Sequence, residues 1–386
     1  MMGTLQQNVH ASSADSNAAD SVLLPATSFV RNGMNAPLSN SQCAAFFIDT
    51  VSLFSGVLRG HMGRWLYSER KNRNDEVRGS KLWSQFVLNS LTFYMHSADL
   101  MMLSLVLDDI LNHVPEGTSL IDFGPGSAEA FKLKSLALIR KIKPDSYYPI
   151  DFCGEFLTSS GKILGKRIAD GQIDWPITIE AIRMDFFNRD RLIETDARRT
   201  SLLFMGGGTI ANLPHMTNDN SFPKAAYINY LKQLYGATVG DAYLLLPFDT
   251  NQDRDSLLAS YSDNIYAKWM ENLPFRIKRD LPIQPLERSG FKPHAFRYEP
   301  QWCSKKNLLA HTLVVTEQQI FKLASTPFEL NVGDRLYINN SYKIPRDTMV
   351  EIASKANWDV VAEYPVSDKK YTGILFKKGF INGFSK

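Results

Sequence analysis

The chain has 386 residues, enough for one large domain or two of ordinary size. Its composition, 44% apolar and 22% charged, is typical of a soluble globular protein, and a formal net charge of +3 is too small for a nucleic-acid-binding surface. Three widely spaced cysteines argue against a disulfide framework or a zinc cluster and favour a reducing compartment. We therefore expect a cytoplasmic protein with no nucleic-acid partner.

The first 38 residues are rich in serine, alanine and asparagine. They contain neither a basic segment nor a long apolar run, so they do not resemble a secretory signal, and we predict a disordered leader over residues 1–38. The apolar run 44–58 carries Asp49, Thr50 and Ser52, which makes it too short and too polar to span a bilayer. The sequence therefore predicts no membrane partner.

Helical periodicity dominates residues 39–113. Helices are predicted to begin near Asn40, Ser80 and Ser97, which are residue types favoured at helix starts. Aromatic connectors at 64–67 and 92–95 separate these helices. Taken alone, aromatic residues in such connectors are most simply explained as parts of the hydrophobic core.

The segment 119–128 combines a short apolar strand with a glycine turn. The strand carries Asp122 near its end, Gly124-Pro-Gly126 turns the chain, and a helix is predicted to begin near Glu129. Glycines allow the backbone to approach a ligand closely, and a helix start presents unpaired N–H groups. The spacing suits S-adenosylmethionine (SAM) or a dinucleotide, although a glycine turn alone can be no more than a tight turn.

Strands and helices alternate after this turn. Strands are predicted at 147–150, 177–182, 201–205 and 242–246, with helices at 129–143, 156–169 and 223–235. This alternation predicts a doubly wound parallel sheet with right-handed crossovers, in which ligands bind at the carboxyl ends of the strands. The residues predicted at those ends are Asp122, Asp151, Asp185, Gly206 to Gly208 and Asp249.

The pattern changes beyond Asp249. A helical stretch at 256–279 precedes strands at 295–298, 308–315 and 335–338, which look antiparallel. A helix at 345–356 then leads into a closing hairpin of strands 359–366 and 372–376. A hairpin that closes a parallel sheet with an antiparallel last strand is typical of SAM methyltransferases and not of NAD dehydrogenases. We interpret residues 249–341 as an insertion before this hairpin.

Several short segments stand in an order that matches a known family. They are Arg64-Trp-Leu-Tyr67, Arg78-Gly-Ser-Lys-Leu82, Phe93-Tyr-Met-His96, Tyr148-Pro-Ile-Asp151, Phe204-Met-Gly-Gly-Gly-Thr-Ile-Ala-Asn212, Phe328 with Gly333-Asp334, and Asn339-Asn-Ser-Tyr-Lys343. From Arg64 onward the chain thereby resembles the histidine Nα-methyltransferase family of the ergothioneine pathway. Relatives in that family methylate other amino acids, including tryptophan derivatives.

The resemblance implies an α/β fold, with a Rossmann-like class I SAM methyltransferase domain and a second, smaller α+β substrate-binding domain. The methyltransferase domain would comprise residues 101–248 and 346–386, and the substrate-binding domain residues 39–100 and 249–345. The implied cofactor is S-adenosylmethionine, the implied partner is a small-molecule amino-acid substrate, and no metal is implied.

The resemblance also implies site residues by position. Cofactor contacts would come from the glycine turns and from acids at strand ends: Asp122, Gly124 and Gly126 around the methionine and ribose moieties, Asp151 at the ribose hydroxyls, Asp185 at the adenine, and Gly206. The substrate side would be built from neutral polar groups: Tyr67 at the methyl-transfer position, Tyr94 at the amino group, Asn212 and Tyr261 at the carboxylate, and Asn339 and Ser341 at the side chain.

The chain departs from the family pattern in ways that affect the expected substrate. Ala128 replaces the third motif glycine, and Ala130 stands where the family has lysine. The glutamate with which the family reads histidine is Asn339 here, and a methionine of the histidine enzymes aligns with Ala310. A neutral amide can accept an imidazole N–H but does not favour a positive ring. We therefore expect a substrate with a bulkier or neutral side chain in place of histidine.

The sequence thus favours a SAM-dependent N-methyltransferase acting on the α-amino group of an amino acid or amino-acid derivative other than histidine. One alternative is a histidine Nα-methyltransferase. The others are a SAM-binding protein without amino-acid turnover and a nicotinamide-dependent oxidoreductase, although the closing hairpin counts against the oxidoreductase.

Overall fold

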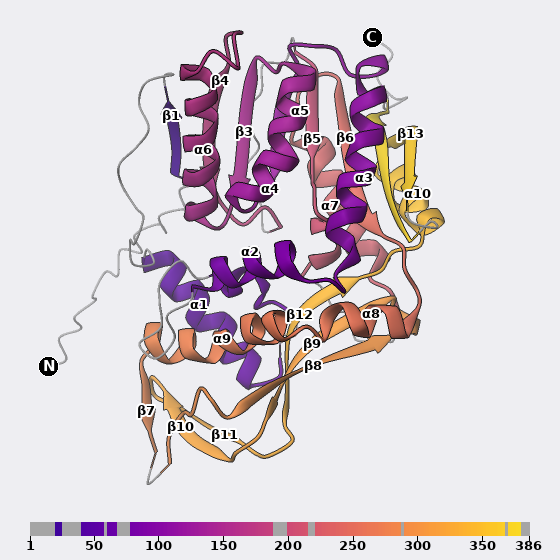
Figure 1. Ribbon diagram of the computed structural model, residues 1–386. Helices are drawn as coiled ribbons and strands as arrows, with labels where there is room; N and C mark the ends of the chain where they lie inside the picture. Colours follow the sequence, from indigo (N-terminus) through magenta and orange to yellow (C-terminus); the bar gives the residue numbers. More distant parts are fainter. Residues whose placement is uncertain are drawn as a thin grey trace, which may run out of the picture.

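The computed structural model describes residues 20–24, 40–57, 60–67, 78–187, 199–214, 221–286, 289–366 and 370–379. These residues form a large sheet covered by helices, and below it in Figure 1 a second lobe of helices and smaller sheets. Within the described part of the chain, no single helix is long and apolar enough to cross a membrane. The pair Gly79–Asn89 and Tyr94–Asn112 reaches that length and composition only together, across a bend of 71°.

The central sheet has the strand order β1-β4-β3-β2-β5-β6-β14-β13. Its parallel strands are β2 (Ser119–Phe123), β3 (Ser146–Asp151), β4 (Thr178–Arg183), β5 (Ser201–Phe204) and β6 (Ala242–Asp249). Strand β14 (Tyr371–Lys378) lies between β6 and β13 (Trp358–Val366) and pairs with both in the antiparallel sense. The predicted doubly wound sheet with an antiparallel closing hairpin is therefore confirmed.

Both faces of this sheet are buried, because its strands are apolar at consecutive positions and not only at alternate ones. Alternate residues join different cores: Leu120, Leu202 and Leu245 face one hydrophobic cluster, whereas Ile121, Leu203 and Leu244 face the other. The covering helices on the first face are α3 (Tyr94–Asp109), α4 (Ala128–Leu133), α5 (Ser135–Ile142) and α6 (Gly154–Ala169), and on the second α7 (Lys224–Gly236) and α10 (Arg346–Lys355).

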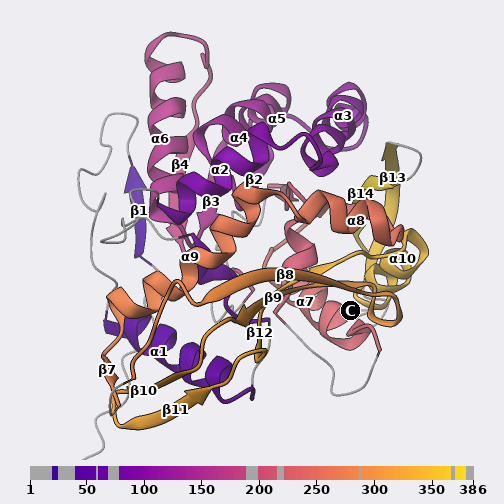
Figure 2. The same ribbon diagram turned by 60° about the horizontal axis from the view of Figure 1, so that its bottom comes forward.

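The second lobe combines N-terminal helices with the late insertion (Figure 2). Its helices are α1 (Asn40–Phe54), the 3-10 turn η1 (Gly63–Leu66), α2 (Gly79–Asn89), α8 (Arg254–Tyr261) and α9 (Asn264–Asp280). One sheet contains β8 (Phe296–Cys303), β9 (Leu308–Val315) and β12 (Arg335–Tyr342), and another β7 (Ile283–Pro285), β10 (Gln319–Leu323) and β11 (Thr326–Leu330). Helix α3 starts at Tyr94 and packs on β13 and β14, so it crosses the boundary that we placed at residue 100.

Two predicted helices are each divided in the structure. The helix expected at 129–143 breaks at Lys134 into α4 and α5, and the stretch at 256–279 divides into α8 and α9. The second division has a clear cause, because Asp263 caps α9 by accepting the backbone N–H groups of Ile265 and Tyr266. Asp253 caps α8 in the same way. The sheet of β7, β10 and β11 was not predicted.

Most of the predicted leader lies outside the described residues. The exception is Asp20–Leu24, which forms β1 and pairs antiparallel with β4 at the edge of the sheet. Disorder was expected there, but the run Val-Leu-Leu in these residues suits a strand, and pairing satisfies backbone groups that β4 would otherwise expose.

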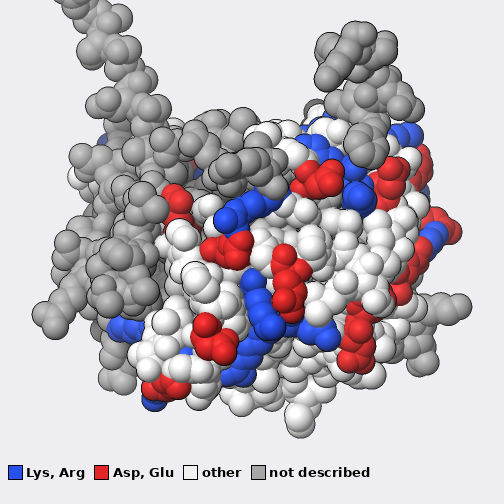
Figure 3. Space-filling model, turned by 90° about the horizontal axis from the view of Figure 1, so that it is seen from above, with Lys and Arg blue, Asp and Glu red and all other residues white. Residues whose placement is uncertain are grey.

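Charged side chains are mixed on the face at the far end of the sheet from the second lobe. Among the residues coloured in Figure 3, basic and acidic groups alternate over this face. This distribution is in keeping with the small net charge of the chain.

Candidate active site

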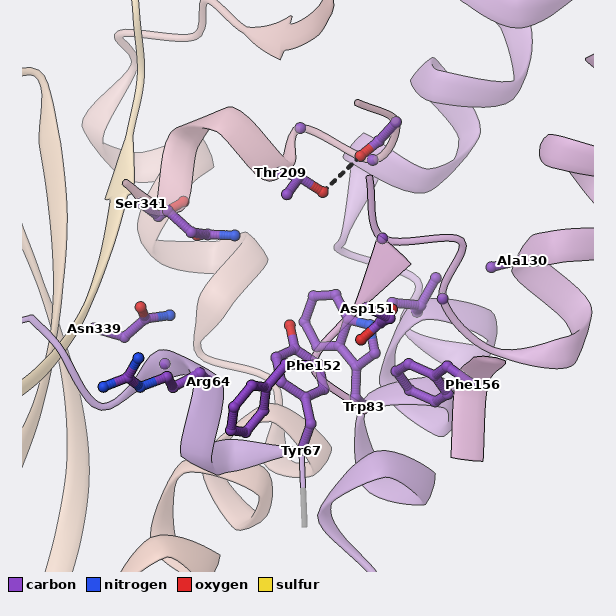
Figure 4. Close-up of a pocket in the computed structure, with 18 of the residues that line it drawn as sticks. Arg64, Tyr67, Trp83, Ala130, Asp151, Phe152, Phe156, Thr209, Asn339 and Ser341 are labelled. Atoms are coloured by element: carbon purple, nitrogen blue, oxygen red, sulfur yellow. Dashed lines mark hydrogen bonds between the residues drawn. The ribbon is translucent and has the colours of Figure 1, made fainter. Parts of the chain in front are cut away.

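A cavity of about 460 Å³ lies between the carboxyl ends of the parallel strands and the second lobe (Figure 4). The structure brings together at its wall most of the residues that the sequence singled out. They are Tyr67, Gly124, Gly126, Asp151, Asp185, Gly206, Asn212, Tyr261, Asn339 and Ser341. Asp122, Tyr94 and Ala310 do not line it.

Two glycine segments form one side of the cavity. Gly124 and Gly126 have φ values of +81° and +73°, which other residues adopt at a cost, and Ser127 then caps α4 by accepting the N–H of Ala130. The segment Gly206–Gly208 follows β5. A Cβ on Gly206 would lie 2.6 Å from the Phe204 ring, and one on Gly208 would lie 2.7 Å from the Met95 methyl. Close packing against these side chains requires glycine at both positions, and the glycine segments after two neighbouring strands line the cavity.

Two carboxylates stand at the ends of the next two strands. Asp151 ends β3 and accepts the N–H of Cys153 through Oδ1 at 2.8 Å. Asp185 follows β4 and accepts the N–H of Phe187 at 3.1 Å. Because both side chains line the cavity, they form an acidic edge beside the glycine turn.

Arg64 is a site residue that sequence reasoning did not single out. Its guanidinium contacts Asp185 at 2.5 Å and Asp49 of α1 at 2.8 Å. Burial by itself would lower the pKa of Arg64, but the two carboxylates outweigh it and raise the pKa. The sequence signal for Arg64 was its position in Arg64-Trp-Leu-Tyr67, the first segment that matches the family. The pairing links the second lobe directly to the acidic edge of the sheet.

Aromatic rings form much of the cavity wall. The Tyr67 ring lies 5.2 Å from Trp269, 5.8 Å from Trp83 and 6.1 Å from Phe156, and Figure 4 shows Tyr67, Trp83 and Phe156 grouped near Asp151. Burial, and then the charge of Asp151, raises the pKa of the Tyr67 hydroxyl, which therefore stays neutral at ordinary pH. Such a wall excludes water and offers π faces to a cation.

Neutral polar groups face the cavity from the second lobe and from the loop after β5. Asn212 comes from η3 (Thr209–Asn212), Tyr261 from the end of α8, and Asn339 and Ser341 from β12. The Tyr261 and Ser341 hydroxyls are 3.2 Å apart. Asn339 packs against Gly63, where a Cβ would lie 2.5 Å from its Oδ1. These contacts require glycine immediately before Arg64.

A buried ion pair lies directly behind Tyr261. The Lys343 ammonium contacts the Asp249 carboxylate at 2.8 Å, and both side chains are fully buried. Lys343 also donates to the Tyr261 hydroxyl oxygen at 3.0 Å. Because an ammonium only donates, the Tyr261 oxygen must accept this bond, and its own proton is directed to Met95 Sδ at 3.2 Å or to the Ser341 hydroxyl. Burial alone would lower the pKa of Lys343, but Asp249 and then Tyr261 raise it, so the lysine stays protonated.

Tyr94 belongs to this buried network and not to the cavity wall. Its hydroxyl donates to Asp249 at 2.7 Å and accepts from the Asn251 amide at 3.0 Å. The expected contact with a substrate amino group therefore has no support in the geometry, because the first residue of α3 turns toward the end of β6. Ala310 pairs with Asn340 in the β9–β12 ladder, so the room expected from it is not added to the cavity.

Asp122 is likewise buried beneath the cavity. Only 1% of it is exposed, and it accepts the hydroxyl proton of Tyr147 at 2.7 Å. As a strand residue it points to the face opposite Ile121 and Phe123, toward the covering helices. Asp122 is therefore placed to support the turn from below and does not line the cavity.

These features fit SAM as the bound cofactor. The glycine segments allow a nucleoside and an amino-acid chain to approach backbone N–H groups, and Asp151 offers a carboxylate to ribose hydroxyls. The aromatic wall suits a sulfonium cation. The strand order with an antiparallel hairpin and this cavity together define the class: a Rossmann-like SAM-dependent methyltransferase.

Comparison with known proteins agrees with this class and specifies the family. Residues 62–378 match the family described as histidine-specific methyltransferase, SAM-dependent, and the chain belongs to that family. The cofactor, the recognised family and the fold class predicted from the sequence are thereby confirmed.

Individual relatives are more distant. The chain is 27% identical to an uncharacterized protein, y4iF, of Sinorhizobium fredii over 247 residues, which cover 63% of this chain and 75% of that protein. A SAM-dependent methyltransferase structure from Clostridium acetobutylicum matches with a TM-score of 0.39 and 9% identity, over 78% of this chain and 97% of that one. DesVI of Streptomyces venezuelae matches with a TM-score of 0.38 and 9% identity, over 78% and 98%.

Replacing Lys343 should strongly destabilise the protein. In Lys343→Met the fully buried Asp249 loses its cation, and we expect unfolding to become easier by about 3–5 kcal/mol in urea denaturation. The exposed Lys355, paired with Glu351 on α10, is a matched control, and Lys355→Met should cost less than about 0.5 kcal/mol. The double variant Lys343→Met, Asp249→Asn should recover part of the loss, and an undiminished loss would contradict an ionic origin.

Asp122 should make stability fall as the pH rises. Burial raises the pKa of Asp122 from 3.8 to about 6, outweighing the hydrogen bonds and the Lys134 charge that lower it. Between these values the folded state binds more protons than the unfolded state, so the free energy of unfolding of the wild type falls as the pH rises from 3.8 to about 6. The full loss of up to about 3 kcal/mol is reached by about pH 6 and persists above it.

Urea unfolding at pH 4, 5, 6 and 7 tests this pH dependence. Compared with Asp122→Asn, the wild type should show most of the expected loss of about 3 kcal/mol in unfolding free energy between pH 4 and pH 7. Asp108→Asn, on the exposed face of α3, controls for the loss of one carboxylate. If the free energies of unfolding of the wild type and of Asp122→Asn changed with pH in parallel, burial would not raise the pKa of Asp122.

Proposed function

We propose that the protein transfers a methyl group from SAM to the α-amino group of an amino acid or amino-acid derivative other than histidine. The observation that carries this proposal is the hydroxyl pair of Tyr261 and Ser341 on the cavity wall, with the Lys343 ammonium bound to Tyr261 from behind. Since Lys343 occupies a lone pair of the Tyr261 oxygen, this hydroxyl is biased to donate, and its acceptor in the structure is the weakly accepting Met95 Sδ at 3.2 Å. A donor of this kind suits a carboxylate.

The remaining polar groups support an amino-acid substrate. Asn212 projects from the loop that follows the second glycine segment, so its amide can contact a head group held next to the cofactor. Tyrosine, serine and asparagine are neutral, and they can orient a neutral amine without competing for its proton. Thr209 holds the loop by donating to the Gly206 carbonyl at 2.7 Å (Figure 4).

The chemistry requires positioning more than acid–base catalysis. When bound, SAM supplies an activated methyl group for in-line displacement by the amine. The work left to the protein is to hold the amine in line and to exclude water. The rings of Tyr67, Trp83 and Trp269 pack against one another in the cavity wall and exclude water. The hydroxyls of Tyr261 and Ser341 lie on the side of the second lobe, where they can hold the substrate in line.

Asn339 is the observation against histidine as the preferred substrate. The Asn339 side chain carries no charge, and Gly63 packs against it. A protonated imidazole at this place would find no carboxylate on Asn339, and the carboxylates of Asp49 and Asp185 are already paired with Arg64. An uncharged side chain meets no such penalty.

A mixed amino-acid pool incubated with the protein and SAM gives the direct test. Mass spectrometry should show a gain of one, two or three methyl groups on an amino acid other than histidine. If histidine were clearly the best substrate, the proposal that histidine is not preferred would be wrong, but the proposal of amino-acid methylation would stand. SAM binding without transfer to any amine would identify the protein as a SAM-binding protein without turnover and overturn the proposal.

Changing Asn339 should shift preference toward histidine. In Asn339→Glu a charge-assisted hydrogen bond to imidazole becomes available, which we expect to raise kcat/KM for histidine about tenfold or more relative to the best neutral amino acid. Asn339→Gln has the same length without the charge and should leave the ratio close to that of the wild type. An equal shift in both variants would mean that size, and not charge, governs this position.

A further inference from the structure

Lys134 stands at the break between α4 and α5 and faces the cavity. Its φ and ψ of −115° and −77° depart from helical values, and 13% of its side chain is exposed. The ammonium lies beside the second glycine segment, since a Cβ on Gly207 would be 3.2 Å from Nζ. Lys132, two residues earlier, is exposed on the surface. The break therefore directs one lysine of this helix pair into the site.

Asp99 of α3 holds this ammonium in place. Its Oδ2 contacts Lys134 Nζ at 3.1 Å and accepts the N–H of Gly207 at 3.2 Å, while Oδ1 accepts the Tyr371 hydroxyl at 2.8 Å. Both carboxylate oxygens of Asp99 are thus engaged by donors. The Lys134 ammonium has three N–H groups, and Asp99 is the one ion-pair partner it has within the described parts of the chain. The arrangement leaves donors of a fixed cation for an anionic group in the cavity.

The order of groups along the sheet indicates which part of a ligand reaches Lys134. Asp185 follows β4 and Asp151 ends β3, and the family resemblance assigns these to the adenine and the ribose. The next strands in the sheet are β2 and β5; the glycine segment after β5 lies beside Lys134, and the glycine turn after β2 lines the same cavity. The part of SAM beyond the ribose is the methionine moiety, whose only anionic group is a carboxylate.

We propose that Lys134 binds the carboxylate of the methionine moiety of SAM, and that Asp99 is the residue that positions its ammonium. Ala130 lines the same cavity one helical turn earlier and offers no charge there. The cation for this carboxylate therefore comes from the helix break. This assignment concerns the cofactor and does not depend on which amine accepts the methyl group.

Calorimetric titration with S-adenosylhomocysteine and with its decarboxylated analogue tests the assignment without an acceptor. The wild type should prefer the carboxylated ligand by about 10- to 100-fold, as for a charge-assisted hydrogen bond. Lys134→Met should lower the affinity for S-adenosylhomocysteine by that factor and leave the affinity for the decarboxylated analogue within about twofold of the wild-type value. The preference for the carboxylated ligand would then be lost. Lys132→Met is the matched control and should leave both affinities unchanged.

Further variants separate recognition from structure. Lys134→Gln can still donate to Asp99 and should also lose the preference, which provides the test if Lys134→Met does not fold. Lys134→Arg should retain the preference for the carboxylated ligand. Ala130→Lys in the Lys134→Met background should restore part of the affinity for S-adenosylhomocysteine. Equal weakening of both ligands in Lys134→Met and Lys134→Gln, or no weakening, would overturn the proposal.

Discussion

The buried ion pair of Lys343 and Asp249 is the interaction on which the rest of the site depends. Asp249 ends β6 of the central sheet, and Lys343 follows β12 of the second lobe, so one contact joins the two halves of the cavity. Such a pair is stable only when its remaining hydrogen-bonding capacity is satisfied. Tyr94, Tyr261 and the backbone N–H of Asn251 do this. The pair thereby fixes Tyr261 at the wall and draws Tyr94 away from it.

A second link between the halves lies at the other end of the cavity. Arg64 joins Asp49 of the second lobe to Asp185 at the acidic edge of the sheet. The lobe that carries Asn339 and Ser341 is therefore held at both ends to the sheet that carries the glycine turns. For methyl transfer these two links are useful, because the reaction depends on holding two groups in line and on excluding water.

Much of the sheet was predictable from the sequence, because fully buried parallel strands are apolar runs that alternate with helices. The order of the strands came from the structure. Sites for backbone contact were predictable too, since Gly124 and Gly126 occupy φ values that favour glycine. The break at Lys134 and the sheet of β7, β10 and β11 were not, because short elements have weak periodicity and are decided by packing. The orientation of Tyr94 was also beyond reach, since position in a motif does not say which way a side chain turns.

The sequence by itself determined the class of fold, the strand ends at which a ligand binds and the chemical character of the site, because these follow from local patterns of apolar residues, glycines and acids. Only the tertiary structure decided which of those residues meet. It placed Asp122 and Tyr94 in buried networks, where desolvation requires hydrogen-bond partners, and it brought Arg64 and Lys134 to the cavity from segments whose charge alone indicated no role. Long-range charge pairing cannot be read from neighbours in sequence, since it depends on contacts such as that between Lys134 and Asp99 across the folded chain.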